Sequence, residues 1–315
     1  MTFQERTMTT SHPGGTGTIG RHTVARIGYG AMGLGHQLPR DDATAVLRRA
    51  VELGVNHIDT ASFYDDGTVN RRIRDALTPY PDDLVIVSKV GARPAAGPVP
   101  LALAQHPADL RAAVERDLAE LGLEQIPVVN LRRADIGPGL TAEGDQIVDL
   151  DDQLAEMITL RDEGKIGAIG ISNVDLPTLR RALPAGIVCV QNVYSLLNRS
   201  HEDELALCRE QGIAWVPFFP LGSAFPGFPK VAENAVVQRI AADLGAGGAQ
   251  VGLAWLLAHA PNTLLIAGTT SAAHLEENLA AGALTLSEQQ LADLDAVDAA
   301  LPDGDGVQPF LDEHR

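Results

Sequence analysis

Three ionisable side chains follow two neighbouring apolar runs of the chain. Asp59 and Tyr64 come after the run 55–58, and Lys89 ends the run that begins at Leu84. If these runs are adjacent parallel strands, their carboxyl ends meet at one rim, where catalytic residues lie in strand–helix barrels. A Lys ammonium beside a Tyr lowers the pKa of the phenol from about 10, and a nearby carboxylate keeps the ammonium charged. The spacing predicts a Tyr that passes a proton near neutral pH, as carbonyl reduction requires.

Each of these residues also has an ordinary structural role. Asp59 can cap a helix, Tyr64 can be a half-buried loop aromatic, and Lys89 can be a solvated strand end. Taken singly, these roles are commoner than catalysis. The joint pattern favours a site, because all three residues fall just after consecutive apolar runs.

The composition narrows the class of protein. The chain has 315 residues and a formal net charge of −17, without a notable cluster of Lys or Arg. This balance argues against nucleic acid and anionic membranes as partners, although a small anionic ligand needs only local donors. Two cysteines, Cys189 and Cys208, give neither a disulfide framework nor metal-ligand spacing. No apolar run approaches roughly 18 residues, and the first residues lack a signal-peptide pattern, so we expect a cytoplasmic protein.

Strand-like and helix-like segments alternate along the chain, which is typical of an α/β fold with a parallel sheet. Eight strand runs, each followed by helix, predict a closed (β/α)8 TIM barrel with an N-terminal hairpin cap and an extra C-terminal helix at 287–298. The first run begins at Ile27, and the others are 55–58, 84–88, 128–133, 166–171, 187–191, 213–219 and 264–267. An open doubly wound sheet is the alternative, but the Gly-x-Gly-x-x-Gly fingerprint between a strand and a helix is missing.

The segments outside this pattern also carry expectations. Residues 1–16 are expected to be a disordered tail, 17–300 one barrel domain, and 301–315 a C-terminal tail. The irregular segments 92–106, 134–147 and 224–230 are expected to be loops that shape the barrel mouth, since long loops often bind ligands. The glycines after Ile27 are interpreted as allowing close backbone approach to a ligand.

Other strand ends carry polar side chains as well. Arg132 and Arg133 are either solvated or place one guanidinium in the site as a fixed donor. Ser172 and Asn173 follow the fifth strand run, where small polar side chains can bind an amide. Ser271 is expected to cap a helix, and the backbone N–H groups at the start of that helix suit a phosphate.

Together, these motifs resemble the aldo-keto reductase superfamily from about Arg21 to Asp298. The blocks that carry the resemblance are 54–64 (Gly-Val-Asn-His-Ile-Asp-Thr-Ala-Ser-Phe-Tyr), 88–89, 170–173 (Gly-Ile-Ser-Asn), Gln191, 268–270 and 277–278. Two further blocks, 128–132 and 216–222, are similar to a bacterial branch that includes pyridoxal reductases.

The resemblance implies a cofactor and a role for each motif residue. The cofactor is an extended nicotinamide dinucleotide, usually NADPH, with NADH the less favoured alternative. Asp59, Tyr64 and Lys89 match three members of the family's catalytic tetrad, and Tyr64 would be the general acid. The residues that would bind the cofactor are Ser172, Asn173 and Gln191 at the carboxamide, Phe218 on the nicotinamide ring, Leu221 and Ser223 at the pyrophosphate, and Gly268, Thr269, His274, Glu277 and Asn278 around the adenosine end.

The chain departs from the family pattern at two places. The tetrad His is expected on the fourth strand, where this chain has Arg132. A guanidinium donates several hydrogen bonds and is always charged, so Arg132 is hypothesised to polarise the carbonyl or to bind an acidic or phenolate substrate. Many relatives place Lys and Arg on the 2′-phosphate, whereas this chain has Gly268 and His274, which weakens the electrostatic case for NADPH.

The leading interpretation is an NADP(H)-dependent reductase that converts a small aldehyde or ketone, such as pyridoxal, to the alcohol. No metal is implied, and no nucleic acid or membrane partner is expected. The protein is expected to be a monomer or a weak homo-oligomer. An alternative is a non-catalytic NADP(H)-binding, redox-sensing partner protein, since some superfamily members also lack the tetrad His. A third possibility, an internal redox step in isomerisation or dehydration, has no support beyond the room that Arg132 leaves.

Overall fold

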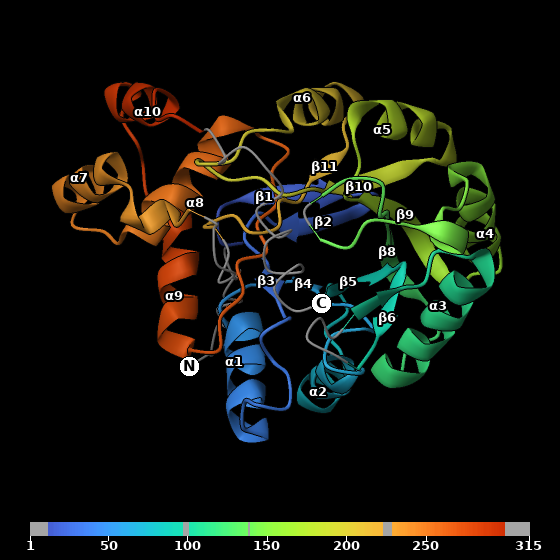
Figure 1. Cartoon of the computed structure of the whole chain (residues 1–315). Coiled ribbons are helices and arrows are strands. Elements are labelled where there is room, and N and C mark those ends of the chain that lie inside the picture. The colour runs from blue at the N-terminus through green and yellow to red at the C-terminus, as the bar shows by residue number, and fades with distance from the viewer. Residues whose placement is uncertain (1–11, 97–100, 138, 223–228, 300–315) are drawn as a thin grey trace, which may run out of the picture.

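The computed structural model describes residues 12–96, 101–137, 139–222 and 229–299. Its centre is a curved sheet of seven strands, in which each neighbouring pair is parallel, with helices around it (Figure 1). In sheet order the strands are β3 (Tyr29–Gly30), β4 (His57–Asp59), β5 (Val85–Val90), β8 (Ile126–Arg132), β9 (Ile166–Ser172), β10 (Ile187–Gln191) and β11 (Ala214–Trp215).

The eighth strand run closes the ring. It forms isolated parallel bridges on both sides, Trp215 with Thr263 and Ile27 with Leu265. The carbonyl oxygen of Leu265 accepts a hydrogen bond from the amide of Gly28 at 2.8 Å. The fold is therefore the predicted (β/α)8 barrel, with its last strand present as bridges rather than as a continuous ladder.

The glycines after Ile27 serve this closure. A Cβ on Gly30 would come within 2.4 Å of the carbonyl oxygen of Ile266, and a Cβ on Gly28 would lie 2.1 Å from the ring of His57. The close approach that these two glycines allow is to the protein itself. Gly30 needs this space where the first and last strands meet, and Gly28 needs it against β4; the approach of this segment to a ligand stays a prediction.

Helices follow the strands on the outside of the ring (Figure 1). They are α1 (Arg40–Glu52), α2 (Thr68–Leu77), α3 (Pro107–Leu121), α4 (Leu150–Asp162), α5 (Leu176–Ala182), α6 (Glu202–Gln211), α7 (Ala235–Leu244), α8 (Gly248–His259), α9 (Ala272–Ala280) and α10 (Glu288–Asp295), with the 3-10 turns η1 (Gly144–Gln146), η2 (Leu183–Ala185), η3 (Val231–Glu233) and η4 (Ala281–Ala283). The apolar stripe of α3 packs inward, since Leu110, Val114 and Leu121 are fully buried. No single helix among the described residues is long and apolar enough to cross a membrane.

An apolar cluster fills the inside of the barrel. Its buried members are Ile19, Val24, Val85, Val87, Val128, Cys189, Ala214, Val216, Leu264 and Ile266. The first two come from the antiparallel hairpin of β1 (Thr16–Ile19) and β2 (His22–Ala25). The predicted hairpin therefore exists, and it adds its apolar side chains to the interior below the polar rim.

One predicted loop contains regular structure. Within 92–106, β6 (Ala92–Pro94) and β7 (Leu101–Leu103) form a small antiparallel pair. The expectation of an irregular segment was wrong there, because strands of three residues are too short to show a period of two. Residues 97–100, between the two strands, lie outside the described residues.

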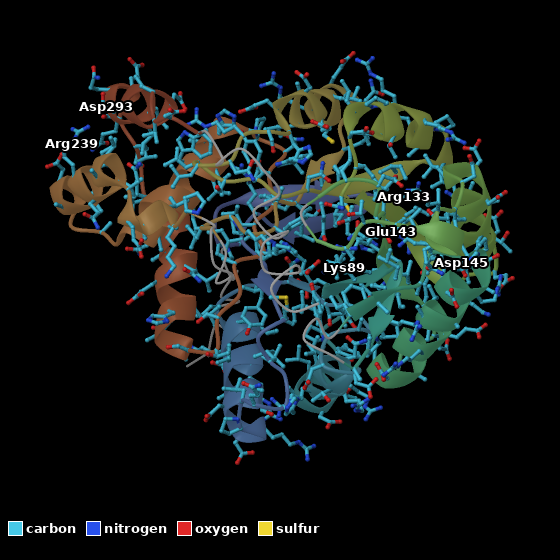
Figure 2. The ribbon with its side chains drawn as sticks, viewed as in Figure 1. Lys89, Arg133, Glu143, Asp145, Arg239 and Asp293 are labelled. Atoms are coloured by element: carbon cyan, nitrogen blue, oxygen red, sulfur yellow. The ribbon has the colours of Figure 1, made fainter. Side chains whose placement is uncertain are left out.

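The C-terminal helix α10 is fastened to the outside of the barrel. Ser287 and Gln290 form a capping box at the start of this predicted helix. At its other end, the indole nitrogen of Trp255 donates to Asp295 at 2.8 Å, while Arg199 donates to the carbonyl of the same residue at 2.9 Å. An ion pair, Arg239 with Asp293, also joins α10 to α7 away from the strands (Figure 2).

An aromatic cluster lies beside this attachment. The ring of Tyr194 is edge-on to Trp215 with centroids 5.8 Å apart, and parallel to Trp255 at 6.3 Å. The guanidinium of Arg199 lies over Trp255, 4.8 Å from the ring centroid. Arg199 and Trp255 therefore contact each other as well as α10.

His57 is a buried histidine at the start of β4, and its imidazole makes the stability of the fold depend on pH. It is 1% exposed, and burial lowers its pKa to about 4, although the carbonyls of Ala25 and Leu265 act to raise it. The folded chain thus binds this proton more weakly than the unfolded chain. The contribution of His57 to stability is complete above about pH 6.5 and is lost as the pH falls toward 4.

We predict that acid destabilises the protein less when His57 cannot titrate. When the pH falls from 7 to 4.5, the wild type should lose roughly 2–3 kcal/mol more free energy of unfolding than His57→Gln. The reason is that protonation of the imidazole favours the unfolded wild type, whereas the amide side chain of the variant does not titrate. Urea unfolding at the two pH values measures this difference. Equal losses in the two proteins would contradict the prediction.

Candidate active site

The carboxyl ends of the strands present polar side chains to the inside of the barrel. Side chains alternate along a strand, and Val85 and Val87 belong to the interior cluster, so Lys89 points inward from β5. The same alternation carries β8 from Val128 to Arg132. Figure 2 shows Lys89 within the ring of strands. The rim is therefore polar where the lower interior is apolar.

Lys89 joins the first two strand ends. Its ammonium donates to Asp59, to the hydroxyl of Tyr64 at 3.0 Å and to the carbonyl of Thr60 at 3.0 Å. The second oxygen of Asp59 accepts from the amide of Gln191 at 2.6 Å. Burial acts to lower the pKa of Lys89, but Asp59 and Tyr64 outweigh it, and the pKa is raised. The ammonium is therefore charged in the folded chain.

Tyr64 lies in a tight turn after β4. The two residues that follow, Asp65 and Asp66, both have a φ of 52°, a left-handed conformation that costs energy in residues other than Gly. The ring of Phe63 packs edge-on against Tyr64 with centroids 5.3 Å apart. This turn places the phenol against Lys89, so the structure brings Asp59, Tyr64 and Lys89 together.

The pKa of Tyr64 moves in the direction opposite to the prediction. Burial raises the pKa of the phenol above its ordinary value, and this effect exceeds the lowering by Lys89 and Arg132. The expectation of a lowered pKa was wrong, because the spacing of residues does not reveal how far the rim is desolvated. A phenol with a raised pKa is protonated at neutral pH, which is the state that a proton donor needs.

The two arginines at the end of β8 diverge. Arg133 donates to both carboxylate oxygens of Asp135 at 2.7 Å and to the side chain of Gln153, so it has a structural role. Arg132 lies close enough to Tyr64 for each to act on the other's pKa; burial lowers that of Arg132. Arg132 is therefore the guanidinium that enters the site.

Ser172, Asn173 and Gln191 gather at the ends of β9 and β10. Each is at most 3% exposed. The Oε1 of Gln191 has no hydrogen-bond partner in the described part of the chain. Asn173, with a φ of 60°, donates its amide to the carbonyls of Arg133 at 3.3 Å and Ile136 at 2.6 Å. Asn173 thus holds the loop after β8, a role that the sequence does not suggest.

Two further predicted cofactor residues, Phe218 and Leu221, follow β11 in the chain. Phe218 is half-buried and edge-on to Phe219, with centroids 5.1 Å apart, and Leu221 packs against the core. Ser223 falls outside the described residues, as does most of the loop 224–230.

The start of α9 has the cap that the sequence predicts. Ser271 accepts a hydrogen bond from the amide of His274, and its own amide donates to the hydroxyl of Thr269. Beside it, Gly268, His274 and Glu277 are exposed, and Asn278 is half-buried. The described residues contain no group of three or more His, Cys, Asp or Glu side chains that could hold a metal ion.

Comparison with known protein families identifies the family of the chain. Residues 26–299 match the model of the Aldo/keto reductase family. The chain belongs to that family. It is therefore an oxidoreductase, as the resemblance predicts.

Individual proteins that are similar to this aldo/keto reductase support the family assignment. It is 44% identical over 290 residues to the pyridoxine 4-dehydrogenase of Escherichia coli (strain K12), a match that covers 90% of this chain and 98% of that protein. A crystal structure of a Klebsiella pneumoniae aldo-keto reductase in complex with NADPH has a TM-score of 0.75 at 26% identity, covering 92% of this chain and 96% of that one. A thermostable aldo-keto reductase in complex with the inhibitor epalrestat has a TM-score of 0.74 at 28% identity, covering 89% and 98%.

Sequence reasoning missed two buried glutamines that hold the rim of this reductase. Gln105, 2% exposed, donates to the carbonyl of Gly91 at 2.6 Å and to that of Arg132 at 3.0 Å. Gln153 in α4 donates to the carbonyl of Gln105 at 2.6 Å and accepts from Arg133. These bonds tie the ends of β5 and β8 together. Nothing in the sequence marks either residue, because its partners are distant along the chain.

A second missed group lies behind the Lys89 contacts. Asp117 in α3, fully buried, accepts from Asn70 at 2.7 Å and from the hydroxyl of Ser88 at 2.5 Å. The side chain of Asn70 in turn accepts from the hydroxyl of Thr60 at 2.7 Å. Ser88 precedes Lys89, and the carbonyl of Thr60 binds its ammonium. This network therefore fixes the backbone on both sides of the ion pair.

We predict that the buried charge of Asp117 weakens the fold at alkaline pH. Burial raises the pKa of Asp117 to about 7, so its stabilising protonated form is progressively lost as the pH rises through that value. The free energy of unfolding of Asp117→Asn, relative to the wild type, should increase by roughly 2–3 kcal/mol from pH 5 to pH 8. Chemical denaturation at both pH values measures the change. A difference that does not vary with pH would show that this carboxyl does not titrate between them.

Proposed function

We propose that this protein is an NADP(H)-dependent reductase that converts a small aldehyde to the alcohol. The observation that carries the proposal is the buried contact of the Lys89 ammonium with Asp59 and with the hydroxyl of Tyr64 at 3.0 Å. A buried ion pair beside a phenol, at the carboxyl rim of a barrel, is an arrangement suited to proton transfer.

The residues of the rim fit a nicotinamide dinucleotide. The Oε1 of Gln191 is a buried acceptor without a partner among the described residues, and buried acceptors of this kind call for a donor such as a carboxamide nitrogen. Ser172 offers a hydroxyl beside it, and Phe218 offers a half-exposed ring. The start of α9 offers backbone N–H groups to a phosphate. When bound, the reduced nicotinamide supplies the hydride.

The chain's own residues then manage the proton and the charge. Tyr64 is protonated at neutral pH and donates its proton to the carbonyl oxygen as the oxygen gains charge. Lys89 holds the hydroxyl in place and stabilises the phenolate that remains, while Asp59 keeps Lys89 charged and oriented. Arg132 donates to the substrate from the neighbouring strand and polarises the carbonyl.

Pyridoxal is the substrate that we propose, in line with the name of the E. coli relative at 44% identity. The similarity spans almost the whole of both chains, which favours a shared substrate class. We further infer one barrel domain over residues 17–300, a cytoplasmic location, and a monomer or weak homo-oligomer. The absence of a strongly basic patch from the sequence supports a small molecule rather than a nucleic acid as the partner.

A second candidate function, an NADP(H)-binding redox sensor without turnover, is favoured by one observation. Arg132 stands where the family has its catalytic His. Against it, Asp59, Tyr64 and Lys89 are present and in contact, and a protein that only binds the cofactor has no need of them.

We predict that Tyr64→Phe removes turnover and leaves cofactor binding intact. The variant lacks the proton that the carbonyl oxygen requires, so kcat/KM for pyridoxal should fall about 10²- to 10⁴-fold. NADPH oxidation measures turnover, and calorimetry measures the affinity for NADPH, which should not change. Retained turnover would exclude Tyr64 as the acid. If the wild type bound NADPH tightly but reduced no aldehyde of a broad panel, the sensor would be the better assignment.

We predict a modest preference for NADPH over NADH, roughly tenfold in kcat/KM. The segment 268–280 contains no Lys or Arg, so a 2′-phosphate there would rely on hydroxyls, backbone N–H groups and His274. Steady-state kinetics with both cofactors, repeated with His274→Ala, measure this. The variant should lower kcat/KM with NADPH and leave NADH unaffected; a preference for NADH in the wild type would contradict the cofactor assignment.

A further inference from the structure

Arg132 is a partly buried arginine whose guanidinium has no hydrogen-bond or ion-pair partner among the described residues. Its guanidinium makes no hydrogen bond and no ion pair with any residue that the structure describes, and neighbouring Arg133 makes both. The other arginines of the described chain that are not exposed also bind carbonyls or carboxylates, as Arg26 and Arg72 do. A desolvated guanidinium is costly when its donors are unused. Such a cost is expected at a binding site, where a ligand accepts the unused hydrogen bonds of the guanidinium.

The surroundings of Arg132 fix where that ligand must lie. The side chain extends inward from β8, and Gln105 holds its backbone carbonyl. Gly139, in the loop after β8, has a φ of 116°, and a Cβ there would lie 3.1 Å from a guanidinium nitrogen of Arg132. Burial lowers the pKa of Arg132, and the nearby Tyr64 acts to raise it. The guanidinium therefore lies beside the loop and near enough to the Tyr64 phenol for the two groups to interact electrostatically.

The charges at the rim do not balance. Lys89 and Arg132 bring two positive charges, while Asp59 is the only described carboxylate paired with either of them. Ser172 and Gln191 are neutral. Although the whole chain carries −17, this part of the rim lacks one negative charge. A substrate with one anionic group would supply it.

We propose that Arg132 selects aldehydes that carry an ionised oxygen on the atom next to the carbon bearing the carbonyl, and that it binds this oxygen while Tyr64 donates to the carbonyl oxygen. The inference rests on the proposed function and names its substrate class. Two oxygens in this relation lie on the same side of the substrate, so neighbouring donors can bind both. An oxyanion conjugated to an aldehyde also pushes electrons into the carbonyl and makes it a poorer hydride acceptor. A guanidinium on the oxyanion withdraws that charge. The ring hydroxyl of pyridoxal stands in this position.

The first test compares four aldehydes: 2-hydroxybenzaldehyde, 2-methoxybenzaldehyde, 4-hydroxybenzaldehyde and benzaldehyde. At a pH where the phenols ionise, the wild type should favour the 2-hydroxy compound over the 2-methoxy compound roughly 10- to 100-fold in kcat/KM, the range for hydrogen bonds to charged groups. Arg132→Gln should abolish this preference, because its kcat/KM should fall further for the 2-hydroxy compound than for the 2-methoxy compound or benzaldehyde. Arg132→Lys should keep part of it. Arg209→Gln, which removes an exposed arginine of the outer helix α6, is the matched control and should behave as the wild type.

The second test does not depend on turnover. In the protein loaded with NADP⁺, bound 2-hydroxybenzaldehyde should ionise at a lower pH than the free compound, because Arg132 stabilises its phenolate, and absorbance of the phenolate reports this. Arg132→Gln should remove the shift. The proposal is overturned if the variant lowers kcat/KM equally for all four aldehydes, or if the shift persists without Arg132. Reduction of none of the four by the wild type, with no shift on binding, would overturn the proposal, whereas a shift without reduction would support the binding role of Arg132 and count against the proposed reductase.

Discussion

A buried ammonium must find partners, and the partners of Lys89 organise the rim of this barrel. Leaving such a charge unpaired in the interior would cost several kcal/mol, so Asp59, Thr60 and Tyr64 converge on it from one neighbouring strand and the turn after it. Their convergence requires that β4 and β5 keep their register, in which Asp59 pairs with Val87. The hydrogen-bond network of Thr60, Asn70, Asp117 and Ser88 supports this arrangement. It holds the backbone next to both members of the ion pair.

Much of this arrangement follows from sequence because parallel strands end together. The runs that became β4 and β5 were visible as apolar segments, and their carboxyl ends had to meet at one edge of the sheet. The meeting of Asp59, Tyr64 and Lys89 is thus a consequence of topology. Alternation along β8 would also have selected Arg132 over Arg133, since Val128 is inward and the period is two. The strand pattern alone left that choice open, because neither the inward face nor the partner Asp135 was known, and only the family resemblance pointed to Arg132.

The features of the site that the sequence did not predict depend on residues that are far apart in the chain. Gln105 and Gln153 are separated by 48 positions, and Asp117 lies 47 positions from Asn70, so no local pattern indicates their hydrogen bonds. The direction of the pKa shift at Tyr64 failed for a related reason. It is set by a balance between one nearby charge, which the spacing suggested, and desolvation by the whole rim, which it did not. The resemblance to the aldo/keto reductase family suggested a role for most site residues. Its catalytic His is replaced by Arg132 in this chain, so the role of that position has to be inferred from the structure.

The placement of the two tryptophans has a practical consequence. Trp215 and Trp255 are the only ones in the chain, and both contact the ring of Tyr194, while Trp255 also binds Asp295 at the end of α10. Ultraviolet emission from the protein will therefore come from one flank of the barrel. It will register loosening of the last helix and be a poor monitor of side-chain rearrangement around Lys89.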